Sequence, residues 1–125
     1  MTEAFYSKEH QWVRLEGKEA RVGITDFAQS SLGDVVYVEL PKNGIAFEKG
    51  EQAAVVESVK TASEVYSPIA GRVSAVNTAL EVTPELVNSD PEGAAWFFIL
   101  AVDGKPNYSG LMTKAAYLDY VKTLE

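Results

Sequence analysis

Residues 53–68, near the middle of the 125-residue chain, read Ala53-Ala54-Val55-Val56-Glu57-Ser58-Val59-Lys60-Thr61-Ala62-Ser63-Glu64-Val65-Tyr66-Ser67-Pro68. An apolar run enters a short polar segment and a second strand-forming run leaves it, which predicts a β-hairpin with Lys60 at its tip. Small residues surround this lysine. An exposed lysine amine stays charged, so chemistry on it calls for an external enzyme that encloses it. The ordinary alternative is a solvated lysine in a turn.

Further short runs of strand-forming residues lie on both sides of this hairpin. The two runs nearest the N-terminus are joined by Glu16-Gly17-Lys18, which indicates a second hairpin. Another run, rich in valine, ends at Pro41, because proline lacks the N–H that a strand ladder needs. The predicted strands cover residues 11–15, 19–24, 34–40, 52–57, 65–66, 72–76 and 95–102.

Short helical segments are predicted between and after the strands. Thr25 offers an N-cap oxygen to a segment that ends at Leu32, and Gly33 is placed to end it in a left-handed conformation. Thr83-Pro84-Glu85 begins one helical turn that runs through Val87. At the C-terminus, residues spaced i, i+3, i+4 and i+7 give one apolar helical face, made of Tyr117, Tyr120, Val121 and Leu124.

Together these elements predict a mainly β fold, a sandwich or barrel that carries a few short helices, one of them at the C-terminus. A chain of 125 residues makes one domain over 1–125 and buries a core without a disulfide or a metal. The order of the strands does not follow from the sequence alone.

The composition excludes several classes of function. The chain has no Cys and one His, which removes Cys-based zinc, iron–sulfur and thiol chemistry and His-rich metal sites. The formal net charge of −7 argues against nucleic acid as a partner. The sequence contains no run of ~18 apolar residues of the kind that predicts a membrane helix. The N-terminal residues lack the pattern of a signal or transit peptide, so we expect a bacterial-type cytoplasmic protein.

The hairpin segment at 57–68 (ESVKTASEVYSP) resembles the lipoyl-attachment segment of the glycine cleavage system H protein family. Other blocks resemble that family in the same order and spacing, so the resemblance extends from about residue 10 to residue 120. These blocks are 10–13 (HQWV), 22–29 (VGITDFAQ), 32–41 (LGDVVYVELP), 67–73 (SPIAGRV), 76–77 (VN), 84–91 (PELVNSDP) and 111–112 (LM).

The resemblance implies a monomeric carrier and not an enzyme. Its fold would be a barrel-sandwich hybrid of two antiparallel sheets, and Lys60 would carry covalently attached lipoate. The lipoyl-lysine would accept an aminomethyl group from the pyridoxal-phosphate enzyme glycine decarboxylase and pass the carbon to tetrahydrofolate on the aminomethyltransferase. Dihydrolipoamide dehydrogenase would then re-oxidise the arm. A tethered arm suits such visits, because tethering raises its effective concentration at each active site.

The resemblance also assigns residues around the lysine. It implies that Glu57, Gly71 and Glu64 contribute to recognition by the lipoate-attaching enzyme. Gly71 has an alternative role as a turn residue with positive φ, and Glu64 as a solvated strand acid. Where the family usually reads His-Glu-Trp, this chain has His10-Gln11-Trp12. The usual acid is thought to hold the amine of the loaded arm in a surface cleft, and neutral Gln11 cannot fully replace a carboxylate there.

Other functions remain alternatives. An H-like protein that relays lipoate to the lipoyl domains of other enzymes would use the same lysine, and Gln11 slightly favours it. A biotin carrier usually has Met on both sides of its lysine, where this chain has Val59 and Thr61. A stand-alone enzyme is disfavoured, because no nucleophile and base are paired in the sequence. The resemblance also places His10, with Gln11, at the cleft for the aminomethyl-bearing arm; packing or hydrogen bonding is its ordinary role.

Overall fold

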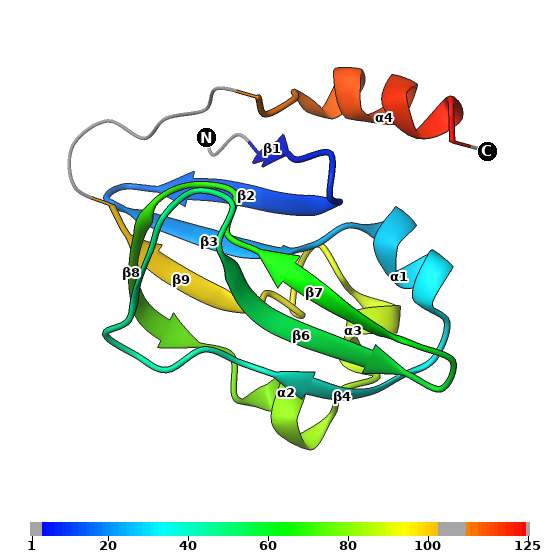
Figure 1. The fold of residues 1–125 in the computed structure, drawn as a ribbon, viewed down its shortest axis with the longest axis horizontal. Helices are drawn as coiled ribbons and strands as arrows, with labels where there is room; N and C mark the ends of the chain where they lie inside the picture. The colour runs from blue at the N-terminus through cyan, green and yellow to red at the C-terminus, as the bar shows by residue number, and fades with distance from the viewer. Residues whose placement is uncertain (1–3, 103–109, 125) are drawn as a thin grey trace.

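The computed structural model describes residues 4–102 and 110–124, and within them nine strands form two antiparallel sheets (Figure 1). The six-stranded sheet has the order β1-β2-β3-β9-β8-β5, and the three-stranded sheet has the order β4-β6-β7. The strands are β1 Ala4–Tyr6, β2 Gln11–Glu16, β3 Glu19–Ile24, β4 Val35–Glu39, β5 Ala46–Phe47, β6 Gln52–Ser58, β7 Ala62–Tyr66, β8 Gly71–Val76 and β9 Phe98–Ala101. The helices are α1 Asp26–Leu32, α2 Ala79–Val82, α3 Leu86–Ser89 and α4 Lys114–Lys122.

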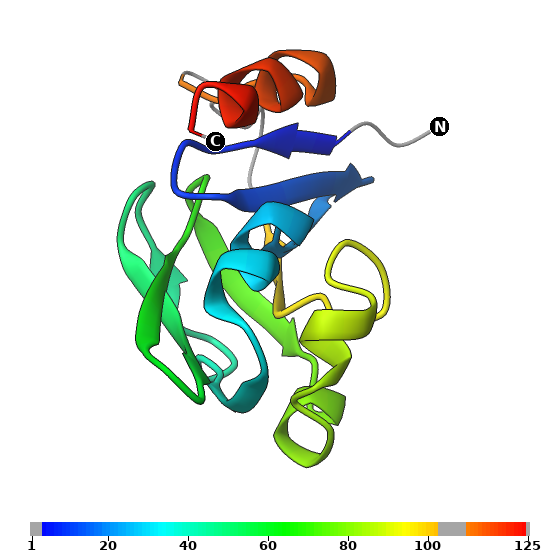
Figure 2. The same ribbon diagram turned by 90° about the vertical axis from the view of Figure 1, so that its right-hand side faces the viewer.

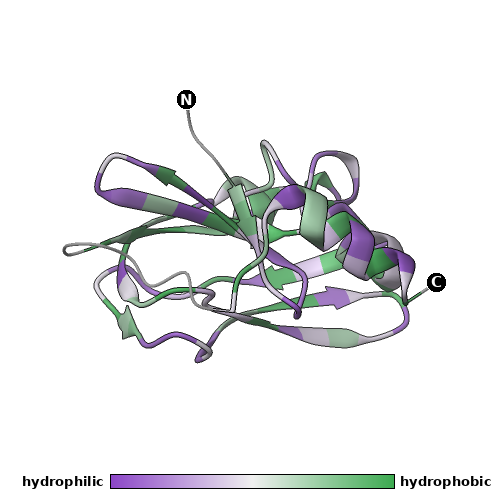
Figure 3. Ribbon diagram, turned by 90° about the horizontal axis from the view of Figure 1, so that it is seen from above, coloured by the Kyte–Doolittle hydropathy of each residue, from purple (hydrophilic) through white to green (hydrophobic). Residues whose placement is uncertain are grey.

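The main core lies between the two sheets. Apolar and polar residues alternate along parts of several strands, as the green and purple bands of the ribbon show (Figure 3), because successive side chains of a strand point to opposite faces. The fully buried side chains of this core come from both sheets and from the segments that connect them. They include Val13, Val22, Val38, Val56, Val65, Ile69, Leu80, Phe97, Phe98 and Leu100.

A second, smaller apolar cluster holds the C-terminal helix against the N-terminal strands. Helix α4 lies over β1, and β1 lies beside β2 (Figure 2). Tyr6, Trp12 and Tyr117 are its buried members. The rings of Tyr6 and Tyr117 stack with their centroids 4.9 Å apart. The helix is therefore tied to the sheet by aromatic contacts that are separate from the main core.

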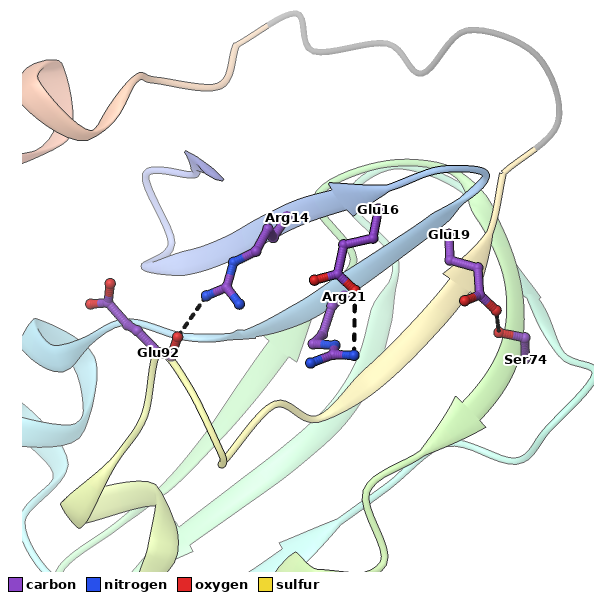
Figure 4. Close-up of polar contacts among 6 residues, drawn as sticks. All are labelled: Arg14, Glu16, Glu19, Arg21, Ser74 and Glu92. Atoms are coloured by element: carbon purple, nitrogen blue, oxygen red, sulfur yellow. Dashed lines mark hydrogen bonds and ion pairs between the residues drawn. The ribbon is translucent and has the colours of Figure 1, made fainter. Parts of the chain in front are cut away.

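Two arginines stand opposite each other on the outer face of the six-stranded sheet, where Arg14 of β2 pairs with Arg21 of β3 (Figure 4). Like charges in this position repel, and each guanidinium makes contacts of its own that offset this repulsion. Arg14 lies 4.8 Å from the ring centre of Trp12. Arg21 lies 5.3 Å from that of Trp96 and forms an ion pair with Glu16 at 3.4 Å.

The loop around Glu92 connects this face to the start of α1. Arg14 Nη2 donates to the Glu92 carbonyl at 2.7 Å (Figure 4). The Glu92 carboxylate accepts from the backbone N–H of Asp26 at 2.9 Å and from the hydroxyl of Tyr6 at 3.3 Å. A carboxylate at a helix N-terminus is stabilising, so this loop helps to fix where α1 begins.

The predicted mainly β architecture, with two antiparallel sheets and a few short helices including one at the C-terminus, is confirmed. Both predicted hairpins form, and the turn between β2 and β3 has Gly17 at φ 67°. The single domain expected over 1–125 includes residues 1–3, 103–109 and 125, which lie outside the described residues. That expectation stays a prediction.

Three predicted element boundaries are wrong. The strand expected over 65–66 already begins at Ala62. The strand expected over 95–102 is only Phe98–Ala101, because the Asn77 side chain donates to the carbonyls of Ala94 and Trp96 and takes up part of that segment. The helical turn expected over 84–87, with Thr83 as its N-cap, spans Leu86–Ser89. Thr83 instead closes α2, a helix that we did not predict, through its N–H to the Ala79 carbonyl.

Three further details differ from the sequence-based expectations. Gly33 ends α1 with the expected positive φ of 81°, but its ψ of −154° lies outside the left-handed helical region. Leu124 lies beyond the last residue of α4 and is 46% exposed, so it does not extend the apolar face. Strands β1 and β5 were not predicted; each is three residues or fewer and pairs at a sheet edge.

Candidate functional site

Lys60 lies in the turn between β6 and β7, where it is exposed to solvent. The hydroxyl of Ser58 accepts from the backbone N–H of Lys60 at 3.3 Å and from that of Thr61 at 3.2 Å. The N–H of Ser58 donates to the Thr61 carbonyl at 2.8 Å. A small hydroxyl residue thus organises the turn from inside, and this local bonding presents the lysine at the tip as predicted.

The turn is also fastened to the loop between α1 and β4. The N–H of Val59 donates to the Asp34 carbonyl at 3.0 Å. A Cβ added to Gly33 would lie 3.7 Å from Lys60 Cε, so the lysine stem passes over this glycine. Within residues 4–102 and 110–124, no carboxylate lies close enough to the Lys60 amine to form an ion pair. The lysine stem is therefore held near a fixed backbone, and the exposed amine is accessible to an external enzyme.

The acids of the hairpin lie on its two strands. Glu57 is half-buried on β6, where it is paired with Ala62 of β7 and with Tyr37 of β4. Glu64 is exposed on β7, opposite Val55. The structure therefore brings Glu57 and Glu64 onto the same hairpin as Lys60.

Gly71 lies away from the lysine. It begins β8, beyond the Gln52–Tyr66 pair that closes the hairpin at the end opposite the turn. The turn conformation with positive φ that we considered for it is wrong: Gly71 pairs with Phe47 inside the six-stranded sheet. A Cβ there would lie 2.9 Å from Leu100 Cβ and 3.1 Å from the Ala101 carbonyl oxygen. Close packing against β9 is what excludes a side chain.

A cleft of about 270 Å³ opens between the β6–β7 hairpin and helix α1. One wall comes from the residues that follow Lys60 along β7. The other comes from His10 and from α1, whose Phe27 and Ser31 are one helical turn apart and so share a face. The lining combines apolar and polar side chains: His10, Phe27, Ser31, Leu32, Thr61 and Glu64 are among them.

His10 lines this cleft in an unusual backbone conformation. Its φ is 70°, the one positive φ outside glycine in the described part of the chain. Its ring lies 4.7 Å from the ring of Phe27, and its Nδ1 lies 2.7 Å from the Tyr117 hydroxyl. Burial lowers the pKa of His10 below its usual 6.5, against the smaller opposing effect of Glu9. The imidazole is therefore held neutral near neutral pH.

Gln11 does not join His10 in the cleft. Its side chain is 2% exposed; Oε1 accepts from the Ser7 hydroxyl at 2.8 Å and Nε2 donates to the Glu9 carbonyl at 3.1 Å. It borders a separate pocket of about 170 Å³ that also includes Lys49 and Tyr66. His10 lies just before β2 with a φ of 70°, and Gln11 is the first residue of β2, so the backbone turns between them and their side chains line different pockets.

Sequence reasoning missed Phe27, Ser31 and Tyr117. Phe27 and Ser31 carry a usable signal, because the predicted helix places them at i and i+4 on one face. Tyr117 carries none, since its spacing indicates only an apolar face. The described residues also bring together no group of three or more His, Asp or Glu side chains that could hold a metal ion. None of the described helices has the length and apolar character needed to span a bilayer.

Comparison with known proteins identifies relatives along nearly the whole chain. The family model of the glycine cleavage H-protein matches residues 4–124. The glycine cleavage system H protein of Bradyrhizobium diazoefficiens is 56% identical over 117 residues, which are 94% of this chain and 96% of that protein. The H protein of Acidiphilium cryptum is 52% identical over 124 residues, which are 99% of this chain and all of that one.

A solved structure agrees with these relatives. The crystal structure of a glycine cleavage system H protein from Mycobacterium marinum matches with a TM-score of 0.85 and 33% sequence identity. The match covers 96% of this chain and 97% of that one. Family model, relatives and fold agree over the same residues, and the chain belongs to the glycine cleavage H-protein family, the lipoyl carriers of the glycine cleavage system.

Proposed function

We propose that Lys60 is the residue of this chain that carries lipoate and that the chain is a carrier without catalytic activity of its own. The observation that carries the proposal is the tip of the β6–β7 hairpin. It presents an exposed amine without an ion pair among the described residues, in a turn organised by Ser58. The apolar part of the neighbouring cleft, with Phe27 and Leu32, suits the hydrocarbon chain of lipoate.

When attached, lipoate supplies the reactive sulfurs that this cysteine-free chain lacks. We propose that the partners are glycine decarboxylase, the aminomethyltransferase and dihydrolipoamide dehydrogenase, which the arm visits in turn. The chain itself supplies a rigid hairpin to which the lipoyl arm is attached. Val59 bonds to the Asp34 backbone, so the hairpin tip is fastened to the body of the protein while the arm moves. The cytoplasmic location and the monomeric state stay predictions.

Recognition by the lipoate-attaching enzyme is proposed to use the hairpin and its surroundings. Glu57 and Glu64 lie on the two strands that lead to and from Lys60. Exposed apolar side chains stand beside them: Val59 is 71% exposed and Tyr37 is 48% exposed. An acidic and apolar surface of this kind fits an enzyme surface of opposite charge, which would favour encounter. Recognition through Gly71 stays a prediction that its position does not support.

The cleft is proposed to shelter the aminomethyl-bearing arm. Among the residues that line it, Glu64 is the one acid, and a carboxylate that faces the amine of the cargo makes a charge-assisted contact. We therefore propose that Glu64, and not position 11, supplies the carboxylate in this chain. Gln11 points away from the cleft, so its difference from the usual acid no longer favours lipoate relay over glycine cleavage as the main role.

Intact-mass measurement tests the proposal directly. Protein from a host with ample lipoate should gain the mass of one lipoyl group, and a Lys60→Arg variant should gain none. The free energy of unfolding of the variant should lie within about 0.5 kcal/mol of the wild-type value, because the side chain at position 60 is exposed. Reconstitution with the three partner enzymes should then release carbon dioxide from glycine only with the lipoylated form. A lipoyl group found on another lysine would refute the assignment.

A further inference from the structure

The hydroxyl of Tyr117 contacts both segments that build one wall of the cleft, the residue before β2 and the N-terminus of α1. It lies 2.7 Å from His10 Nδ1 and 2.7 Å from Thr25 Oγ1. His10 lines the cleft, and Thr25 is the N-cap of α1, the helix that supplies Phe27 to the same wall. Tyr117 belongs to α4, more than 90 residues later in the chain, and is not among the residues that line the cleft.

One direction of the hydrogen bonds around Tyr117 gives the hydrogens of both hydroxyl groups, Thr25 and Tyr117, an acceptor. Thr25 Oγ1 accepts the N–H of Ala28 at 3.3 Å, and in this direction its own hydrogen is donated to the Tyr117 oxygen. Tyr117 then donates its hydrogen to Nδ1 of neutral His10, so the proton of the imidazole is on Nε2. Burial, which lowers the pKa of His10, favours the neutral ring that this arrangement needs.

The position of the hydroxyl is fixed by packing. Tyr117 is 3% exposed, and its ring stacks on Tyr6 with an interplanar angle of 13°. The His10 ring lies between other aromatic side chains, with ring centres 4.7 Å away for Phe27 and 6.2 Å away for Tyr120. A shift of the tyrosine would therefore be transmitted to the imidazole and to the start of α1.

We propose that Tyr117 is a positioning residue for the arm cleft. Its hydroxyl holds the His10 ring in one tautomer and one orientation and ties it to the N-terminus of α1, so that the wall facing the Lys60 hairpin keeps its shape. The C-terminal helix thus acts on the sheltered arm without touching it. This inference rests on the proposed function, since it gives the cleft its role from the arm that Lys60 would carry.

The test is a Tyr117→Phe variant, which removes the hydroxyl and keeps the ring that stacks on Tyr6. In unmodified protein labelled with ¹⁵N, the wild-type imidazole should show one neutral tautomer with the proton on Nε2, and the variant should show both. In lipoylated protein loaded with the aminomethyl group, the variant should release its cargo about fivefold faster without the aminomethyltransferase, the effect of one ordinary hydrogen bond. Tyr120→Phe is the matched control on the same helix and should change neither result.

Either an unchanged tautomer ratio or an unchanged release rate in Tyr117→Phe overturns the proposal, even if the variant melts at a lower temperature. A merely structural tyrosine would lower the melting temperature and leave both measurements as in the wild type. Thr25→Ser keeps the hydroxyl and should behave as the wild type. If Lys60 takes up no lipoate, the proposed function fails, and the tautomer measurement on unmodified protein still decides whether Tyr117 orients His10.

Discussion

Replacement of Gly71 by alanine separates packing from enzyme recognition. The new Cβ would lie 2.9 Å from Leu100 Cβ and 3.1 Å from the Ala101 carbonyl oxygen. Neither atom can move away by a side-chain rotation, because one is bonded directly to the backbone of β9 and the other belongs to it. Leu100 is fully buried. Such overpacking costs about 1–3 kcal/mol, so we expect Gly71→Ala to lower the free energy of unfolding by about 2 kcal/mol.

Urea denaturation followed by tryptophan fluorescence measures this loss. With a slope of about 2 kcal/mol per molar urea, the midpoint should fall by about 1 M. The initial rate of lipoylation, measured without urea where both proteins are folded, should stay within about a factor of two of the wild type, since an exposed and distant hairpin tip is unaffected. Glu57→Gln should show the reverse: nearly unchanged stability and lipoylation slowed about tenfold, as for a lost charged hydrogen bond.

A Gly71→Ala protein as stable as the wild type but poorly lipoylated would refute the packing argument. It would mean that the attaching enzyme reads position 71 itself. If Gly71→Ala shows both slow lipoylation and a lowered urea midpoint, the lipoylation rate is measured again at a lower temperature. Partial unfolding as the cause of slow lipoylation predicts that the rate recovers on cooling. A rate that does not recover contradicts our reasoning.

Three further predictions concern the cleft and its support. The urea midpoint should fall as the pH drops through 6.5, because burial lowers the folded-state pKa of His10 below that value and the unfolded chain then binds the proton first. The His10→Asn variant, whose asparagine tolerates positive φ, should lose this pH dependence. An equal change of the midpoint with pH in the variant and the wild type would contradict the prediction. Glu64→Gln should release the aminomethyl cargo about tenfold faster in a formaldehyde assay, the value of a charged hydrogen bond, and unchanged release would exclude the carboxylate. Gly23→Ala should lower stability by about 2–3 kcal/mol in urea, since its Cβ would lie 2.7–2.9 Å from the buried indole of Trp12; a loss below about 0.5 kcal/mol would refute it.

The sequence predicts the elements that depend on local signals. The Lys60 hairpin follows from two strand-forming runs around small polar residues, and α1 follows from the Thr25 cap, which accepts from Ala28 as expected. The strand over 95–102 is shorter because Asn77, nearly twenty residues earlier, bonds to the carbonyls of Ala94 and Trp96. A contact between such distant residues leaves no periodic pattern in the chain, so local reasoning misses it.

The candidate site divides in the same way. Lys60 is recognisable because the motif around it is contiguous. The cleft is not, since its walls come from His10, from α1 and from β7, and only the pairing of the strands brings them together. The local backbone conformation decides which pocket each of two neighbouring side chains lines. His10 and Gln11 are adjacent in sequence but belong to different pockets, because His10, at φ 70°, lies outside the strand that begins at Gln11.

The position of β9 has a consequence for the order in which the protein folds. In the six-stranded sheet β9 lies between β3 and β8 (Figure 1), so residues 98–101 supply the backbone partners that join the first quarter of the chain to its middle. The three-stranded sheet pairs only residues 35–66 and can form early from nearby segments. Pairing across long sequence separations is slow, and we expect closure by β9 to limit the rate. A nascent chain would then hold a formed lysine hairpin before the barrel behind it has closed.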